Sequence, residues 1–233
     1  MCSGKMSAWQ AAITLCVGVT VAWNATPARA GSVLLTFEGL QQAEQVLNFY
    51  NGGTGSLGSR GTNYGVSFDT YALALTHGSY SGEPSPPTIM SLINQHGNPG
   101  EPLTVHMDVS GGFQTALTFY DVVIDQGTHG TIAIYSGLDG TGSQLASMTL
   151  DYTGSTFGPR QSLTFSGVAH SVVFEGGNDQ IGFDNIGFMT APVVPEPTSL
   201  LLFFTGLGAF GGAAALWRRE SRSRVRQQAG QAL

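Results

Sequence analysis

The chain has 233 residues and a formal net charge of −6, which fits one domain with additional segments at its ends. Between residues 31 and 193 the basic residues are Arg60 and Arg160, against 13 acidic residues. Phosphate binding requires clustered lysine or arginine side chains, so this composition excludes nucleic acid as a partner of the segment.

Residues 1–30 have the layout of a secretory signal peptide. Lys5 precedes an apolar run at residues 11–23, and the small residues Ala28 and Ala30 end the segment. The run is shorter than the ~20 residues that a bilayer-spanning helix needs. We therefore predict export, with cleavage after Ala30. An uncleaved amino-terminal anchor is the alternative.

Both cysteines of the chain, Cys2 and Cys16, lie inside the predicted signal peptide. The mature protein would therefore have no disulfide, although exported proteins often rely on disulfides for stability. We expect its stability to come from the hydrophobic core or from a bound metal ion.

Residues 31–190 contain short runs that are rich in β-branched and aromatic residues and are separated by Gly, Ser, Asn or Asp. The predicted strands are 33–37, 65–68, 72–76, 103–109, 114–124, 131–137, 144–150, 161–167, 171–176 and 181–188. No long run has helical periodicity. The segment is therefore predicted to be an all-β module, an antiparallel two-sheet sandwich that is similar to a jelly roll.

Alternating polarity indicates that several of these strands are half-buried. In the strand predicted at 114–124, Leu117, Phe119 and Asp121 share one face, and the residues between them share the other.

Three polar, glycine-rich stretches are predicted to connect the strands. Residues 51–65 and 77–88 are expected to be surface loops, and residues 136–143 are expected to form a hairpin turn.

The sequence of the module contains no catalytic motif that we recognise. Neither G-x-S-x-G nor H-E-x-x-H occurs in the chain. The histidines are scattered, at His77, His96, His106, His129 and His170. Acidic pairs for glycoside hydrolysis can be chosen in many ways from 13 acids, so no one pair is informative. We predict that the protein is not an enzyme.

Tyr64 and Tyr80 are the candidate ligand-binding residues if the module binds a sugar. Sugar sites use flat aromatic platforms, and residues 31–190 contain no tryptophan, so a platform would have to be built from tyrosine or phenylalanine. Tyr50 and Tyr71 lie in the same loop-rich half of the module. The alternative is that these tyrosines pack at the sandwich edge with their hydroxyl groups in water.

Residues 199–217 form an uncharged, apolar segment that Arg218 and Arg219 follow directly. At ~1.5 Å per residue, a helix of this length crosses the hydrocarbon core of a bilayer. Arginines that flank a span stay in the cytoplasm and stop transfer. We therefore predict a transmembrane helix at 199–217, a basic cytoplasmic tail at 218–233, and a module outside the membrane.

The linker at 191–198 contains Pro195, Glu196 and Pro197. Each proline fixes φ near −65° and lacks an amide hydrogen, so the tripeptide is stiff, extended and unable to join a helix or sheet. A processing enzyme in the bilayer could recognise such a segment. A plain linker before a permanent anchor is the alternative.

The order of Pro-Glu-Pro, apolar span and arginine cluster resembles the carboxy-terminal sorting signal of the PEP-CTERM family. The resemblance implies that Pro195, Glu196 and Pro197 are recognised by an exosortase, a membrane-embedded protease or transpeptidase, and that Arg218 and Arg219 are the stop signal. It also implies a Gram-negative bacterium that makes exopolysaccharide.

The module resembles β-sandwich modules that are common in PEP-CTERM proteins. The likeness rests on FEG at 37–39, NFYNGG at 48–53, GVSF at 65–68 and FDNI at 183–186. Such modules are similar in plan to carbohydrate-binding jelly rolls, many of which hold a structural calcium ion between the first and last strands.

Glu38 and Asp184 are therefore the candidate calcium ligands. The first and last strands of a jelly roll often lie side by side, which would bring these two carboxylates together. With carbonyl groups from a glycine-rich loop they would supply the 6–8 oxygen ligands that Ca²⁺ prefers. The alternative is that both side chains cap strands at the surface.

Together these features predict an exported protein that the inner membrane holds transiently. It would then serve as a structural or adhesive component at the cell surface or in the exopolysaccharide matrix. A carbohydrate-binding module for extracellular polysaccharide is the alternative function.

Overall fold

The computed structural model describes residues 30–76, 80–127 and 129–192, which contain nine β-strands and no helix. The strands are β1 (Ser32–Leu35), β2 (Val66–Phe68), β3 (Ala72–Thr76), β4 (Thr88–Leu92), β5 (Pro102–Val123), β6 (Gly130–Tyr135), β7 (Gln144–Leu150), β8 (Gln161–Gly177) and β9 (Ile181–Thr190). The prediction of an all-β module is confirmed for these residues.

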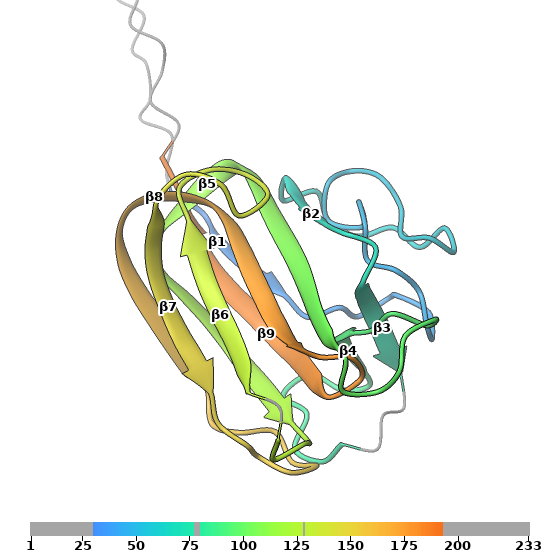
Figure 1. Ribbon diagram of the computed structural model, residues 1–233. Coiled ribbons are helices and arrows are strands. Elements are labelled where there is room, and N and C mark those ends of the chain that lie inside the picture. The colour runs from blue at the N-terminus through green and yellow to red at the C-terminus, as the bar shows by residue number, and fades with distance from the viewer. Residues whose placement is uncertain (1–29, 77–79, 128, 193–233) are drawn as a thin grey trace, which may run out of the picture. The chain divides into compact units, whose positions relative to one another are not determined.

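The nine strands of the described residues form one hydrogen-bonded antiparallel sheet. Its order is β3-β4-β9-β5-β8-β6-β7, with β1 also paired to β9 and β2 also paired to β5. The first and last strands thus lie side by side, with Leu35 opposite Ile186. The expectation of two separate sheets is corrected, because the long strands β5 and β8 run through both halves of the fold (Figure 1).

The continuity of β5 and β8 arises at glycine-containing segments that the sequence analysis read as breaks between strands. Residues Pro102–Asp108 of β5 pair with the second half of β8, and Phe113–Phe119 pair with its first half, with register shifts between them. At this bend Gly112 has a φ of +71°, and a Cβ there would lie 2.6 Å from Cγ1 of Val168. Glycine therefore lets β5 bend without ending.

The halves of the bent sheet enclose the hydrophobic core. Phe174 of β8 and Phe183 of β9 contact each other with ring centroids 4.8 Å apart, although they are not neighbours within the sheet. Phe113, in the middle of β5, contacts Phe165 and Phe188 at 5.3 and 5.2 Å. The fold is therefore a β-sandwich, and burial of these aromatic side chains stabilises it without a disulfide.

Strand β4 was not predicted, because its sequence does not alternate. All five residues of Thr88–Leu92 are buried, since β4 lies between β3 and β9 and is covered on both faces. The outer edge of β3 is also covered: the amides of Ala43 and Val46 donate to the carbonyls of Ala74 and Ala72, at 2.8 and 2.9 Å. The backbone of this edge is therefore not open to pairing with another chain.

Of the residues predicted as a loop at 77–88, Thr88 begins β4, Ser81 forms an isolated bridge to Thr156, and residues 77–79 lie outside the described ranges. The predictions for 114–124, 51–65 and 136–143 agree with the structure. Leu117, Phe119 and Asp121 are buried on one face of β5. Residues 51–65 contain no strand, and residues 136–143 connect β6 to β7 through a turn.

All nine strands and the hydrophobic core that they enclose lie between residues 32 and 190. This segment therefore holds the elements that an independently folding module requires. In the part of the chain that the structure describes, no helix has the length and apolarity needed to cross a membrane.

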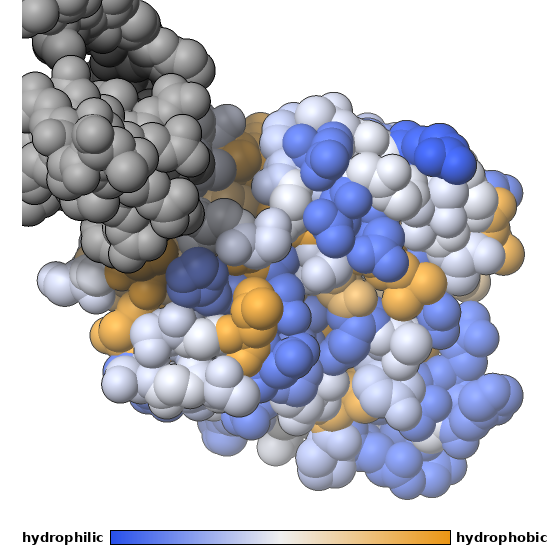
Figure 2. Space-filling model, turned by 90° about the horizontal axis from the view of Figure 1, so that it is seen from above, coloured by the Kyte–Doolittle hydropathy of each residue, from blue (hydrophilic) through white to orange (hydrophobic). Residues whose placement is uncertain are grey.

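The surface of the module has no dominant apolar area on the face seen in Figure 2, where hydrophilic and intermediate residues surround small groups of hydrophobic ones. The large hydrophobic side chains exposed among the described residues are Leu34, Leu57, Tyr71, Leu138, Tyr152, Val168 and Met189. Single exposed apolar residues are usual on folded proteins, so none of them marks a docking surface by itself.

Candidate functional site

The four short motifs of the module meet in one cluster. The ring of Phe37 lies 6.0 Å from the rings of both Tyr50 and Phe68, and the Tyr50 hydroxyl accepts a hydrogen bond from the Phe37 amide at 2.7 Å. Burial raises the pKa of Tyr50, and Tyr64 and Asp184 are close enough to add to the increase. We call the following residues the motif cluster: Phe37, Glu38, Tyr50, Tyr64, Phe68, Asp184 and Asn185.

Asp184 is the central polar group of the motif cluster. Its carboxylate is fully buried and accepts hydrogen bonds from the Ser85 amide at 2.9 Å, the Ser85 hydroxyl at 2.9 and 3.0 Å, and the Asn185 amide at 2.6 Å. Burial raises the pKa of Asp184 to about 6, in spite of these hydrogen bonds, and Glu38 adds to the increase. Asp184 thus anchors the segment that precedes β4 onto β9.

Glu38 and Asp184, the predicted calcium ligands, both accept hydrogen bonds from within the protein. The two side chains do lie near each other, but Glu38 accepts a hydrogen bond from the Thr88 amide at 3.0 Å, and the Asp184 oxygens bond to Ser85 and Asn185. Calcium needs 6–8 oxygen ligands. Within the described ranges, no three His, Cys, Asp or Glu side chains are grouped to hold a metal. Both carboxylates instead tie loops to strands.

Tyr64 and Tyr80, the predicted sugar-binding residues, are both half-buried and lie against different hydrophobic clusters. Tyr64 stacks on Tyr50 with centroids 6.1 Å apart. Tyr80 contacts Phe157 edge-on at 6.3 Å, and burial, with a contribution from Asp179, raises its pKa. The structure does not bring the two tyrosines into one platform, and the packing alternative describes both positions.

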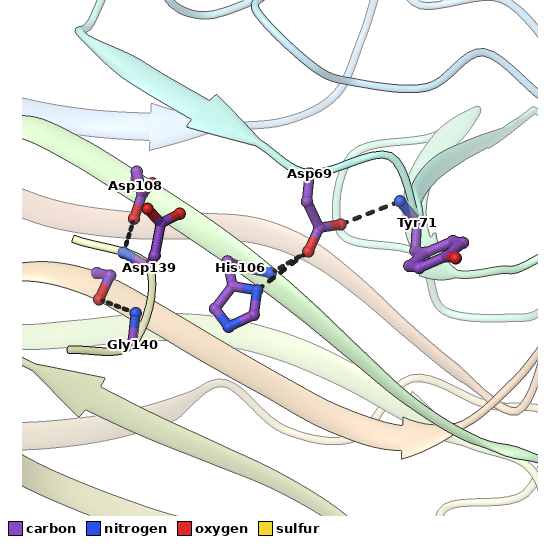
Figure 3. Close-up of polar contacts among 7 residues, drawn as sticks. Asp69, Tyr71, His106, Asp108, Asp139 and Gly140 are labelled. Atoms are coloured by element: carbon purple, nitrogen blue, oxygen red, sulfur yellow. Dashed lines mark hydrogen bonds and ion pairs between the residues drawn. The ribbon is translucent and has the colours of Figure 1, made fainter.

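A second polar cluster, drawn in Figure 3, lies where β5 meets two turns. The Asp69 carboxylate accepts hydrogen bonds from the amides of His106 and Tyr71, at 2.7 and 3.0 Å, and its Oδ2 lies 3.2 Å from Nδ1 of His106. About a third of each of these two side chains is exposed. The bonds to Asp69 hold the turn between β2 and β3 against β5.

The other half of this cluster holds the turn between β6 and β7. Asp108 accepts a hydrogen bond from the Asp139 amide at 2.8 Å, and the Ser171 hydroxyl accepts one from the Gly140 amide at 3.0 Å. Ser171 also donates to the carbonyl of Gly137 at 2.6 Å. Burial raises the pKa of Asp108, and the Asp139 carboxylate adds to the increase. Each contact joins a turn to a strand, which is a structural role.

Glu44 organises the glycine-rich loop at 51–65. Its buried carboxylate accepts hydrogen bonds from the amides of Gln41, Leu57 and Ser59, at 2.8, 3.0 and 3.0 Å. Burial opposes the charged form, but these hydrogen bonds and the Ser59 side chain together lower the pKa of Glu44. The sequence analysis did not single out Glu44, because its partners in the loop lie more than ten positions away along the chain.

A cavity of about 270 Å³ lies where the end of β7 meets the start of β8 and the end of β5. Its lining residues are Asp121, Met148, Thr149, Leu150, Asp151, Tyr152, Thr153, Pro159 and Gln161. Asp121 is only 2% exposed, and its Oδ1 has no hydrogen-bond partner within the described residues. Burial, with a contribution from Asp151, raises the pKa of Asp121 to about 6.

The sequence analysis placed Asp121 on the same strand face as Leu117 and Phe119 but did not identify it as a site residue. A charged side chain at a core position of a strand is a signal in itself, because burying an unpaired charge is unfavourable. What the sequence could not supply was the position of the segment after β7, which brings Asp151 and Tyr152 to the same cavity.

Several predicted residues lie outside the described ranges. His77 is one of them, and the four described histidines belong to no metal-binding group. The signal peptide up to residue 29, the predicted transmembrane helix at 199–217, and the basic tail also lie outside. So do the sorting and stop-transfer residues, which are Pro195, Glu196, Pro197, Arg218 and Arg219. These assignments stay predictions.

Comparison with protein-family models found no match to this chain, and comparison with curated protein sequences found none either. The resemblance to the PEP-CTERM family therefore stays a prediction.

Solved structures give similarities of limited extent. The chain is similar to the K2 cleaved adhesin domain of Lys-gingipain, with 15% identity and a TM-score of 0.43 over 69% of this chain and 99% of that one. It is also similar to a family 43 arabinoxylan arabinofuranohydrolase from Bacillus subtilis, solved with cellotetraose, with 18% identity and a TM-score of 0.34 over 55% of this chain and 27% of that one.

A third similarity is to the amino-terminal modules of a xylanase from Clostridium thermocellum, complexed with xylohexaose. The identity is 10% and the TM-score 0.32, over 67% of this chain and 30% of that one. The chain thus spans less than a third of the length of either enzyme. Similarities of this size assign neither a family nor a function to the chain.

Proposed function

We propose that the protein is a structural or adhesive component of the cell surface or exopolysaccharide matrix of a Gram-negative bacterium, and that it has no catalytic role. In this proposal the signal peptide directs export, and the helix at 199–217 holds the chain in the inner membrane transiently. An exosortase-type protease then recognises Pro195, Glu196 and Pro197 and releases the module. The module itself is proposed to be a jelly-roll-like sandwich.

The observation that carries the structural role is the way the motif cluster uses its polar groups. Asp184 accepts its hydrogen bonds from Ser85 and Asn185, and Glu38 accepts one from Thr88. The Ser85 bonds join segments 99 positions apart in the chain, and the Glu38–Thr88 bond joins segments 50 positions apart. Such cross-links suit a module that has no disulfide and must keep its shape outside the cell.

The delivery part of the proposal rests on the order of residues after the module. Pro-Glu-Pro, an uncharged span and two arginines follow the last strand within 30 residues. A stiff, extended tripeptide next to a membrane span is accessible to an enzyme embedded in the same bilayer.

The test is a double substitution, Pro195→Ala with Pro197→Ala, in the full-length chain in a host that has an exosortase. We expect this variant to accumulate unprocessed in the inner membrane, because its recognition segment is no longer held extended. Pro192→Ala is the matched control, since it lies in the same linker outside the motif, and it should be processed like the wild type. Normal release and trimming of the double variant would contradict the proposal.

Carbohydrate binding is the second candidate function, and the cavity at Asp121 is the observation that favours it. The cavity combines carboxylates with an exposed tyrosine, Tyr152, and so offers the aromatic surface that Tyr64 and Tyr80 do not form together.

A further inference from the structure

We propose that the cavity lined by Asp121, Asp151 and Tyr152 binds a single ring of a neutral saccharide, either a monosaccharide or one residue of a polysaccharide. The inference rests on the second function proposed above, carbohydrate binding, and places that function at a site for which the sequence analysis gave no residue. It does not depend on how the protein is exported or processed.

The size and lining of the cavity fit one sugar ring. Its volume of about 270 Å³ lies just below the range of pockets that hold drug-sized ligands, so the ligand must be smaller. Apolar surface comes from Met148, Leu150 and Pro159, and hydrogen-bonding groups come from Thr149 and Gln161. A pyranose presents the same mixture, with C–H groups on its faces and hydroxyl groups at its rim.

The carboxylates of the cavity require a ligand that donates hydrogen bonds. Asp121 is buried, and its Oδ1 has no partner within the described residues. An unsatisfied buried acceptor is rare and unfavourable, which points to a group that is missing from the protein alone. Asp151 adds a second carboxylate close enough to affect the charge of Asp121. Sugar hydroxyl groups are suitable donors, whereas phosphate and carboxylate ligands would be repelled.

Tyr152 supplies the aromatic ring among the residues that line the cavity. The residue is 50% exposed, compared with 39% for Tyr71, the other tyrosine among the exposed large hydrophobic residues of the described ranges. An aromatic ring with exposed surface can stack against the apolar face of a sugar.

A divalent cation fits the cavity less well than a sugar. Calcium needs 6–8 oxygen ligands, and the walls at Met148, Leu150 and Pro159 offer no side-chain oxygen. The described residues also contain no group of three or more His, Cys, Asp and Glu that could hold a metal.

Backbone hydrogen bonds hold the cavity in place before any ligand arrives. The amides of Thr153 and Gly154 donate to the Val123 carbonyl at 3.0 and 3.1 Å, and the Gly158 amide donates to the Asp121 carbonyl at 2.9 Å. From the other side, the Ser81 amide donates to the carbonyl of Ser155 at 2.9 Å. A site that is already ordered loses little conformational entropy on binding.

The test is saturation-transfer NMR on the purified module, residues 31–192, with D-glucose, D-galactose, D-mannose and D-xylose as the probes. We expect at least one of these sugars to bind with a Kd on the order of 1 mM, as suits a single-ring contact. Tyr152→Ala should weaken this binding by about tenfold, because the stacking surface is lost. Asp121→Asn should weaken it as well, because Asn is a poorer acceptor. Tyr71→Ala is the matched control: Tyr71 is another exposed tyrosine, lies outside the cavity, and should leave binding unchanged.

Three outcomes would overturn the proposal. The first is no binding of any of the four sugars at concentrations on the order of 10 mM. The second is binding that Tyr71→Ala reduces as much as Tyr152→Ala. The third is calcium binding, seen as a rise in Tm that Asp121→Asn removes, without any response to sugar. Because the test uses purified module, its failure leaves the export and processing proposal standing, and failed processing leaves the saccharide site standing.

Discussion

Ser85→Ala removes one hydroxyl group and tests whether the motif cluster stabilises the fold. In the wild type this hydroxyl donates to both oxygens of the buried Asp184 carboxylate, at 2.9 and 3.0 Å, and lies 3.0 Å from Oδ1 of Asn185. The Ser85 amide also donates to Asp184, and the substitution leaves that bond in place. The variant therefore isolates the side-chain contribution.

The size of the effect depends on the charge of Asp184, and so on pH. Burial raises the pKa of Asp184 to about 6, so the folded protein carries a neutral acid at about pH 5 and a carboxylate at about pH 8. A hydrogen bond to a neutral acceptor contributes about 1 kcal/mol to stability, and one to a charged acceptor about 2 kcal/mol. We expect Ser85→Ala to destabilise the module by about 1 kcal/mol at the lower pH and about 2 kcal/mol at the higher pH.

The direction of this pH dependence follows from the linkage between protonation of Asp184 and folding. The Ser85 hydroxyl lowers the pKa of Asp184, so its removal raises that pKa further above the unfolded value of 3.8. The folded variant then holds its proton to higher pH, and its stability falls more steeply as pH rises through 6.

The assay is urea unfolding of the module, residues 31–192, at both pH values, followed by circular dichroism. Ser81→Ala is the control: Ser81 lies in the same segment as Ser85, but its exposed hydroxyl lies 2.8 Å from Thr156 Oγ1, and the hydrogen bonds of Asp184 come from Ser85 and Asn185. It should change the stability by less than about 0.5 kcal/mol. Equal effects of the two substitutions at about pH 8, or an effect of Ser85→Ala that does not grow with pH, would refute the reasoning.

Three further predictions concern Asp184, Asp121 and Glu44. Calcium or a chelator should leave the Tm of the module unchanged, because hydrogen bonds from the protein occupy Asp184; a rise in Tm with calcium, seen by scanning calorimetry, would contradict this structural role. Burial raises the pKa of Asp121 from 3.8 to about 6, so wild-type stability falls as pH rises between those values, and Asp121→Asn should be more stable than the wild type by up to about 3 kcal/mol at about pH 8. Urea unfolding at several pH values checks this, and the same dependence of unfolding free energy on pH in variant and wild type would count against it. Glu44→Gln removes a charged acceptor from the amides of Leu57 and Ser59, so hydrogen exchange at these two amides should speed up about tenfold or more, while exchange in β6 stays as in the wild type; unchanged exchange at both would show that Glu44 does not hold the loop.

The sequence was sufficient to predict the strand content of the module but not how the strands join. Alternation marked the half-buried strands well, as Leu117 and Phe119 illustrate. It missed β4, whose five residues are all buried. It also divided β5 at Gly112, because glycine ends strands more often than it bends them, and a bend depends on contacts with a distant strand.

The candidate sites show the same limit. The pairing of β1 with β9 was anticipated and does bring Glu38 near Asp184. Ser85, which donates hydrogen bonds to the Asp184 carboxylate, lies 99 positions away from it, and a local sequence pattern cannot predict such a contact. Tyr64 and Tyr80 were chosen because they are aromatic and lie in a loop-rich region. Residue type and loop context do not show which other rings a tyrosine packs against in the folded protein.

Intact-mass analysis of the protein recovered from the native cell surface tests the central proposal most directly, because it reports both trimmed ends at once. The account predicts a chain that begins at Gly31 and lacks the residues after Pro197, found in the surface or secreted fraction. A chain that keeps residues 198–233 and stays in the inner membrane would contradict it.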